Sequence, residues 1–119
     1  MFDKIAIIGL GLIGSSIAHA ARRGKLAKEI AGFDVSADVR ARAAKIGFCD
    51  QVYDDLAAAV KNAQLVILAT PVGAYKGVAE AIAPHLAKDA ILSDVGSVKG
   101  AVVRDVGPFV PAGVHFIPA

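Results

Sequence analysis

The sequence predicts an α/β fold with a doubly wound, mostly parallel sheet, and two patterns carry that prediction. Short β-branched runs alternate with longer alanine-rich segments along the whole chain, which is typical of strand–helix–strand units. Several of the runs are continuously apolar, as expected of strands buried on both faces of a sheet. The 119 residues, 55% of them hydrophobic and 20% charged, have the composition of one globular domain spanning residues 1–119.

The individual elements follow from the same patterns. Five apolar runs predict strands, at residues 4–8, 29–33, 65–69, 90–93 and 113–117. The segments between them predict helices, at residues 12–23, 37–46, 56–62, 73–86 and 98–106. Gly24 stands where the first helix should end, and Pro84 predicts a kink or an early end of the fourth.

Charge and composition argue against several classes of function. The 13 basic and 11 acidic side chains are interspersed and leave a net charge of +2, so we expect no nucleic-acid-binding face. Cys49 is the one cysteine, which excludes an internal disulfide and a multi-thiolate zinc site, and we predict no metal centre. The apolar start resembles a secretory signal, but Asp3 and the interrupting glycines count against it. No stretch reaches the ~18 apolar residues of a membrane span, so we expect a cytoplasmic protein without membrane contact.

A glycine-rich turn follows the first predicted strand. Gly9, Gly11 and Gly14 form the pattern G-x-G-x-x-G directly before a predicted helix. In that position the first glycine permits a tight turn, the second lets a diphosphate approach the backbone, and the third lets helix and strand pack closely. The helix start at Leu12 and Ile13 would offer unpaired backbone N–H groups to the phosphates. The turn therefore predicts a Rossmann-type dinucleotide-binding domain.

Asp34 closes the second predicted strand, twenty residues after Gly14. An acid at this spacing accepts hydrogen bonds from the ribose hydroxyls of the adenosine half and repels a 2′-phosphate. The residue thus favours NAD over NADP as the cofactor. The alternative is an aspartate that caps the next helix behind a generic glycine turn.

Two further strand ends carry candidate site residues. Ligands of doubly wound sheets bind at the carboxyl ends of the strands, so Ala69, Thr70 and Pro71 would border the dinucleotide. The alternative there is a turn that makes no ligand contact. Ser97 follows the next strand in a glycine turn, and its residue type suits either a helix cap or a hydrogen bond to a ligand.

Four segments together resemble the nucleotide-binding half of the prephenate and arogenate (cyclohexadienyl) dehydrogenase family: residues 9–16, 68–72, 94–99 and 114–119. The Asp-x-Gly-Ser-Val-Lys segment, at 94–99, is the most restrictive of them. The resemblance implies an oxidative decarboxylation in tyrosine biosynthesis, in which prephenate or arogenate loses carbon dioxide and its ring carbon passes a hydride to NAD. It also implies that Ser97 lies beside the nicotinamide and the substrate hydroxyl, as the candidate catalytic residue of this chain.

The same resemblance implies parts of the enzyme outside this chain. The family's general base is a histidine that opens a His-Pro-x-Ala-Gly motif, which we expect just beyond Ala119; His115 precedes that motif and is not the expected base. A helical domain for substrate binding and dimerisation is also expected elsewhere, in a homodimeric full-length enzyme. We therefore expect residues 1–119 alone to bind NAD without turnover.

Two alternatives remain open from the sequence. The chain could be the nucleotide domain of another reductase, of the β-hydroxyacid or pyrroline-carboxylate type. It could also be a non-catalytic module that senses NAD. The sequence does not separate prephenate from arogenate as the substrate.

Overall fold

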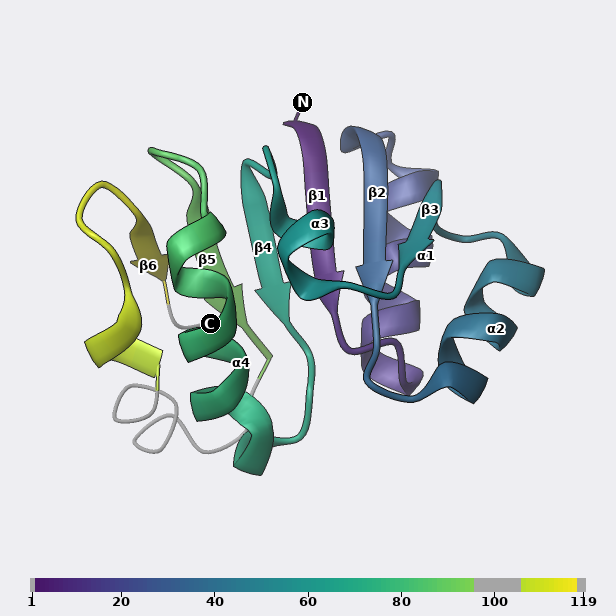
Figure 1. Ribbon diagram of the computed structural model, residues 1–119. Coiled ribbons are helices and arrows are strands. Elements are labelled where there is room, and N and C mark those ends of the chain that lie inside the picture. The colour runs from purple at the N-terminus through teal and green to yellow at the C-terminus, as the bar shows by residue number, and fades with distance from the viewer. Residues whose placement is uncertain (1, 96–105, 118–119) are drawn as a thin grey trace.

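The computed structural model describes residues 2–95 and 106–117, which form one parallel sheet with helices on both faces (Figure 1). Its strands are β1 (Phe2–Ile8), β2 (Ala27–Phe33), β3 (Gln51–Tyr53), β4 (Leu65–Leu68), β5 (Ile91–Asp94) and β6 (His115–Ile117). They lie in the order β3-β2-β1-β4-β5-β6, and every neighbouring pair is parallel. The predicted doubly wound α/β fold is confirmed, and the strand order reverses between β1 and β4, where such sheets open a crevice.

Strand β3 was not predicted. It is three residues long, pairs with the end of β2 and leaves Gln51 exposed at the edge of the sheet. A run this short, with a single β-branched residue, offers no periodicity to read. The five predicted strands are all present, with ends that differ by one or two residues.

The helices are α1 (Leu12–Arg23), α2 (Ala37–Ile46), α3 (Leu56–Val60) and α4 (Tyr75–Ile82), with short 3-10 turns η1 (Val72–Ala74), η2 (Ala83–His85) and η3 (Gly107–Phe109). Helices α1 and α2 have the predicted bounds. Helix α4 ends at Ile82 and Pro84 lies in η2, which confirms the early end that the proline predicts. The helix predicted at 98–106 falls almost wholly outside the described residues. No helix in the described part of the chain is both long and apolar enough to cross a membrane.

The core lies in two layers because the sheet is covered on both faces. Ile5 and Ile7 of β1 pack with the buried alanines of α1 and α2, whereas Ala6 and Ile8 point to the opposite face and pack with α3 and α4. Figure 1 shows α1 behind the sheet and α3 and α4 in front of it. Burial on both sides explains why β1 reads as a continuous apolar run.

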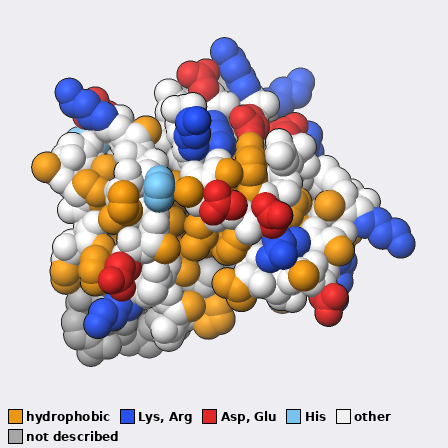
Figure 2. Space-filling view, viewed as in Figure 1, with side chains coloured by type: hydrophobic (Ala, Val, Ile, Leu, Met, Phe, Trp, Pro, Cys, Tyr) orange, Lys and Arg blue, Asp and Glu red, His pale blue; other side chains and the backbone are white. Residues whose placement is uncertain are grey.

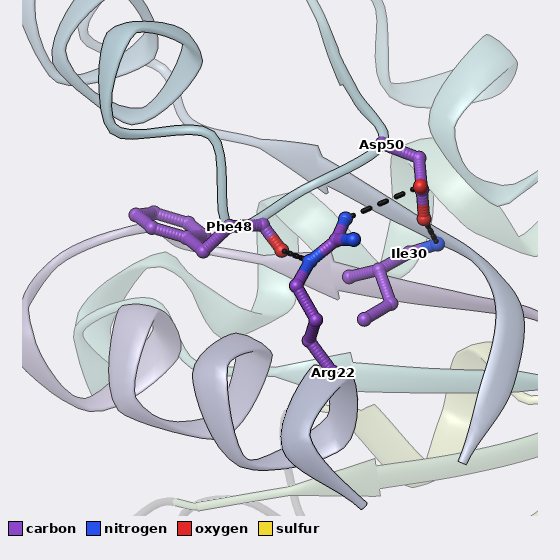
Figure 3. A network of polar contacts seen from close by, with 4 residues as sticks. All are labelled: Arg22, Ile30, Phe48 and Asp50. Carbon is purple, nitrogen blue, oxygen red and sulfur yellow. Dashed lines mark hydrogen bonds and ion pairs between the residues drawn. The ribbon is translucent and has the colours of Figure 1, made fainter. Parts of the chain in front are cut away.

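A polar network ties the end of α1 to the segment before β3 (Figure 3). The Arg22 guanidinium donates to the Phe48 carbonyl oxygen at 3.0 Å and lies 3.2 Å from the Asp50 carboxylate. The other oxygen of Asp50 accepts the backbone N–H of Ile30 at 2.6 Å. This network holds the start of β3 against β2 and thereby fixes the position of α2, which lies between the two strands in the chain.

Candidate functional site

A cavity of about 650 Å³ opens at the carboxyl ends of β1, β2 and β4. Its lining residues are Gly9, Gly11, Leu12, Ile13, Asp34, Val35, Ala69, Thr70, Pro71, Tyr75 and Val95. These ends lie along the lower side of Figure 1, and Figure 2 shows hydrophobic side chains spread across this face down to the same rim. The volume and the apolar walls are those of a small-molecule site at the crevice of a doubly wound sheet.

The structure brings nearly all of the predicted site residues to this one cavity. Gly14 is buried behind the glycine turn instead, and Ser97 lies outside the described residues. Val35, Tyr75 and Val95 line the cavity and were not predicted as site residues. Tyr75 begins an apolar stripe on α4 at helical spacing, which sequence reasoning assigned to the core without noticing that its first member reaches the strand ends.

The three glycines of the turn have different surroundings. Gly9 has φ +104°, and a Cβ there would lie 2.7 Å from the Ala69 carbonyl carbon, so only glycine fits between β1 and β4. A Cβ on Gly14 would collide with the carbonyl oxygen of Gly9. A Cβ on Gly11, by contrast, would meet nothing within 4 Å. Gly9 and Gly14 therefore serve the packing of the turn, while Gly11 leaves open space at the cavity.

The N-terminus of α1 faces this open space without a side-chain cap. Its N-cap residue is Gly11, no side chain accepts from its first N–H groups, and its first turn holds no acidic residue. Leu12 and Ile13 are 86% and 56% exposed. Uncapped N–H groups and the positive end of the helix dipole make this turn an anion-binding position.

Asp34 lies at the end of β2 with both carboxylate oxygens engaged. One accepts the backbone N–H of Leu10 at 2.8 Å and the other accepts that of Ser36 at 2.9 Å. The N-cap of α2 is Ser36, whose hydroxyl accepts from the Val39 N–H at 3.3 Å, so the alternative of Asp34 as the helix cap is wrong. Each carboxylate oxygen keeps a lone pair for a further donor, and the side chain lines the cavity.

A polar cluster lies at the ends of β4 and β5. The Thr70 hydroxyl is buried and has no hydrogen-bond partner among the described residues. The Tyr75 hydroxyl donates to the Leu68 carbonyl oxygen at 3.1 Å. Burial raises the pKa of the Tyr75 phenol, and the negative charge of Asp94, itself 1% exposed, adds to that shift. A buried polar atom without a partner is rare in proteins and marks Thr70 as a position that a ligand could satisfy.

The histidines lie away from this cavity. His115 begins β6 at the opposite, amino-terminal edge of the sheet, with its imidazole 3.8 Å from the Asp89 carboxylate. His19 stacks against Phe48 with 4.9 Å between ring centroids. The site therefore receives no described histidine that could serve as a base.

Comparison with known proteins gives one consistent answer. The family model for the prephenate dehydrogenase nucleotide-binding domain matches residues 17–119. Cyclohexadienyl dehydrogenase of Zymomonas mobilis is 45% identical over 93% of this chain and 38% of that enzyme, and prephenate dehydrogenase of Bacillus subtilis is 36% identical over 98% and 32%. The crystal structure of A. aeolicus prephenate dehydrogenase in complex with hydroxyphenyl propionate and NAD⁺ superposes with a TM-score of 0.85, at 26% identity, over 96% of this chain and 40% of that one.

The chain thus spans about two fifths or less of the length of these relatives. Over that span the fold, the strand order and the sequence all agree. The chain belongs to the prephenate dehydrogenase family and corresponds to its nucleotide-binding domain.

Proposed function

We propose that this chain binds NAD at the carboxyl edge of its sheet, as the nucleotide-binding part of a prephenate or arogenate dehydrogenase. The observation that carries the proposal is the meeting of three features at one cavity: the open side of Gly11, the uncapped N-terminus of α1 and the Asp34 carboxylate. The A. aeolicus relative was crystallised with NAD⁺, which supports the same ligand here.

Each half of the dinucleotide has a proposed position. The diphosphate lies against Gly11 and accepts from the N–H groups at Leu12 and Ile13. The adenosine ribose donates from its hydroxyls to the remaining lone pairs of Asp34, and Ala69, Thr70 and Pro71 border the nucleotide at the end of β4. Ser97 is proposed to lie beside the nicotinamide and the substrate hydroxyl.

The proposed reaction belongs to the whole enzyme. Bound NAD supplies a hydride acceptor, the substrate releases carbon dioxide, and a base takes the hydroxyl proton. The base and most of the substrate pocket are proposed to come from residues outside this chain, in a homodimeric, cytoplasmic enzyme, because the relatives are more than twice as long. The comparisons favour this family over a β-hydroxyacid or pyrroline-carboxylate reductase and over a non-catalytic sensor of NAD.

Gly11 offers a direct test of the NAD site. Gly11→Ala adds a methyl group where the protein has free space, so the fold should be unaffected while the diphosphate loses its closest approach to the backbone. We expect calorimetric titration of the variant with NAD⁺ to show an affinity lower by roughly tenfold or more. The thermal unfolding temperature without ligand should match that of the wild type.

The matched control is Gly77→Ala on α4, where a Cβ also meets nothing within 4 Å and which does not line the cavity. It should keep NAD affinity and gain up to about 1 kcal/mol of stability, since alanine is the better helix former. Equal NAD affinity in Gly11→Ala and the wild type would refute the proposed position of the diphosphate.

A further inference from the structure

Arg40, on the second turn of α2, reaches back to the loop that follows β2. Its Nη1 donates to the Asp34 carbonyl oxygen at 2.7 Å and to the Val35 carbonyl oxygen at 3.3 Å. Among the residues that the structure describes, no carboxylate lies within ion-pair distance of this guanidinium. The contacts engage one of its three nitrogens, so the cation keeps N–H donors for another acceptor.

The position of Arg40 places a positive charge beside the residues that line the ribose end of the cavity. Asp34 and Val35, whose carbonyl groups it holds, both line that cavity, and Val35 is 76% exposed. The N-terminus of α2 adds the positive end of a helix dipole at the same loop. Asp38 lies two positions before Arg40 in the helix, and residues at that spacing do not face each other.

The Asp34 carboxylate opposes this positive charge. Its two oxygens are fixed by the Leu10 and Ser36 N–H groups, so the carboxylate stays at the cavity and does not turn toward solvent. A ribose hydroxyl can donate to it, whereas a phosphate group on that hydroxyl is repelled by it. Arginine is the side chain best suited to a phosphate, because its planar donors match the oxygens.

We propose that Arg40 is a latent anchor for a 2′-phosphate, kept out of use by the charge of Asp34, so that these two residues together set the choice of NAD over NADP. The inference rests on the proposed NAD site and deepens it. It assigns a specificity-determining role to a residue whose visible contacts are only with backbone carbonyl groups.

The test compares NAD⁺ and NADP⁺ affinities, by calorimetry, across a small set of variants. Asp34→Asn removes the charge and keeps one side-chain oxygen to accept from the backbone. We expect it to raise NADP⁺ affinity by roughly tenfold, the effect of a charge-assisted hydrogen bond. Adding Arg40→Gln should abolish that gain. Adding Arg42→Gln instead should preserve it, because Arg42 lies on the same helix but lines a different cavity, with Ser15 and Phe48.

The outcomes separate the two proposals. A double variant Asp34→Asn/Arg40→Gln that binds NADP⁺ as tightly as Asp34→Asn overturns the role of Arg40. No gain of NADP⁺ affinity in a folded Asp34→Asn overturns the role of the aspartate charge. Wild-type chain that binds no NAD⁺ would instead refute the proposed function.

A single variant keeps the proposal testable if Asp34→Asn does not fold. Arg40→Gln in the wild-type background should weaken the residual NADP⁺ affinity severalfold more than the NAD⁺ affinity. An equal loss for the two ligands would mean that Arg40 only braces the loop, and would overturn the proposal.

Discussion

At the residue scale, Thr70 combines a structural penalty with a proposed function. Its buried hydroxyl has no partner among the described residues. Thr70→Val replaces that hydroxyl with a methyl group of similar shape, so the free energy of unfolding should stay equal or rise by up to about 1 kcal/mol. We expect NAD⁺ affinity to fall severalfold in the same protein, because the hydroxyl would no longer be available to the ligand.

Urea unfolding and an NAD⁺ titration check the two effects separately. Thr70→Ser is the control, since it keeps the hydroxyl and should keep most of the NAD⁺ affinity. A loss of stability in Thr70→Val would show that the hydroxyl already has a partner in the protein.

Cys49 predicts a pH dependence of stability. Burial raises the pKa of its thiol from the usual 9.0 to about 11, against the opposing charge of Arg22. The unfolded chain therefore loses this proton at a lower pH than the folded chain. Stability contributed by the protonated thiol is complete below pH 9 and is lost as the pH rises from 9 to 11, by roughly 1–3 kcal/mol.

The measurement is the free energy of unfolding between pH 8 and 11 in the wild type and in Cys49→Ala. The wild type should lose more stability over this range, while the shifts of Lys4, Tyr53 and Tyr75 contribute to both proteins alike. Parallel curves for the two proteins would contradict the buried, protonated thiol.

Sequence reasoning at this scale identified Asp34 and the glycines because their spacing reflects backbone chemistry. It placed Asp34 beside a ligand but did not show that the same carboxylate holds the Leu10 and Ser36 N–H groups. Arg40 was not identified either. Its role depends on a side chain reaching back over six residues, and no periodicity or motif reports such a contact.

At the scale of elements, the Asp50 network makes a prediction about β2 and β3. Ile30 is 2% exposed, and its N–H donates to the Asp50 carboxylate at 2.6 Å. Asp50→Ala leaves that buried N–H without a partner and should lower the free energy of unfolding by roughly 1–3 kcal/mol. Asp50→Asn keeps an acceptor and should lose less.

The control is Lys28→Ala, which removes an exposed ion pair with Asp3. Exposed pairs of this kind contribute little, so this variant should unfold within about 0.5 kcal/mol of the wild type. Urea unfolding distinguishes the cases. Asp50→Ala no less stable than Lys28→Ala would mean that the Ile30 N–H finds water instead.

The elements themselves were predictable to different degrees. Helices α1 and α2 have clear start and stop residues and appear at the predicted bounds. Helix α4 is shorter than its apolar pattern, because the chain approaches it through η1 and leaves it at Pro84. Strand β3 gave no signal, since its pairing depends on the tertiary position of Asp50 and not on its own residues.

At the scale of the whole molecule, the alternation of strands and helices predicted the architecture. Burial of both faces of β1 made its run continuously apolar, and the glycine turn marked the end of that strand. The sequence did not show which strand ends form one cavity with the turn. That depends on β4 lying beside β1, although β2 and β3 come between them in the chain.

The central claim is that NAD binds at the carboxyl edge of this sheet, across the ends of β1, β2 and β4. Amide NMR spectra of the chain, recorded during a titration with NAD⁺, test it most directly. The account predicts shifts at Gly9, Gly11, Val35 and Thr70, and none at Asp89 or His115 on the opposite edge. Shifts confined to that opposite edge, or no shifts at millimolar NAD⁺, would contradict the claim.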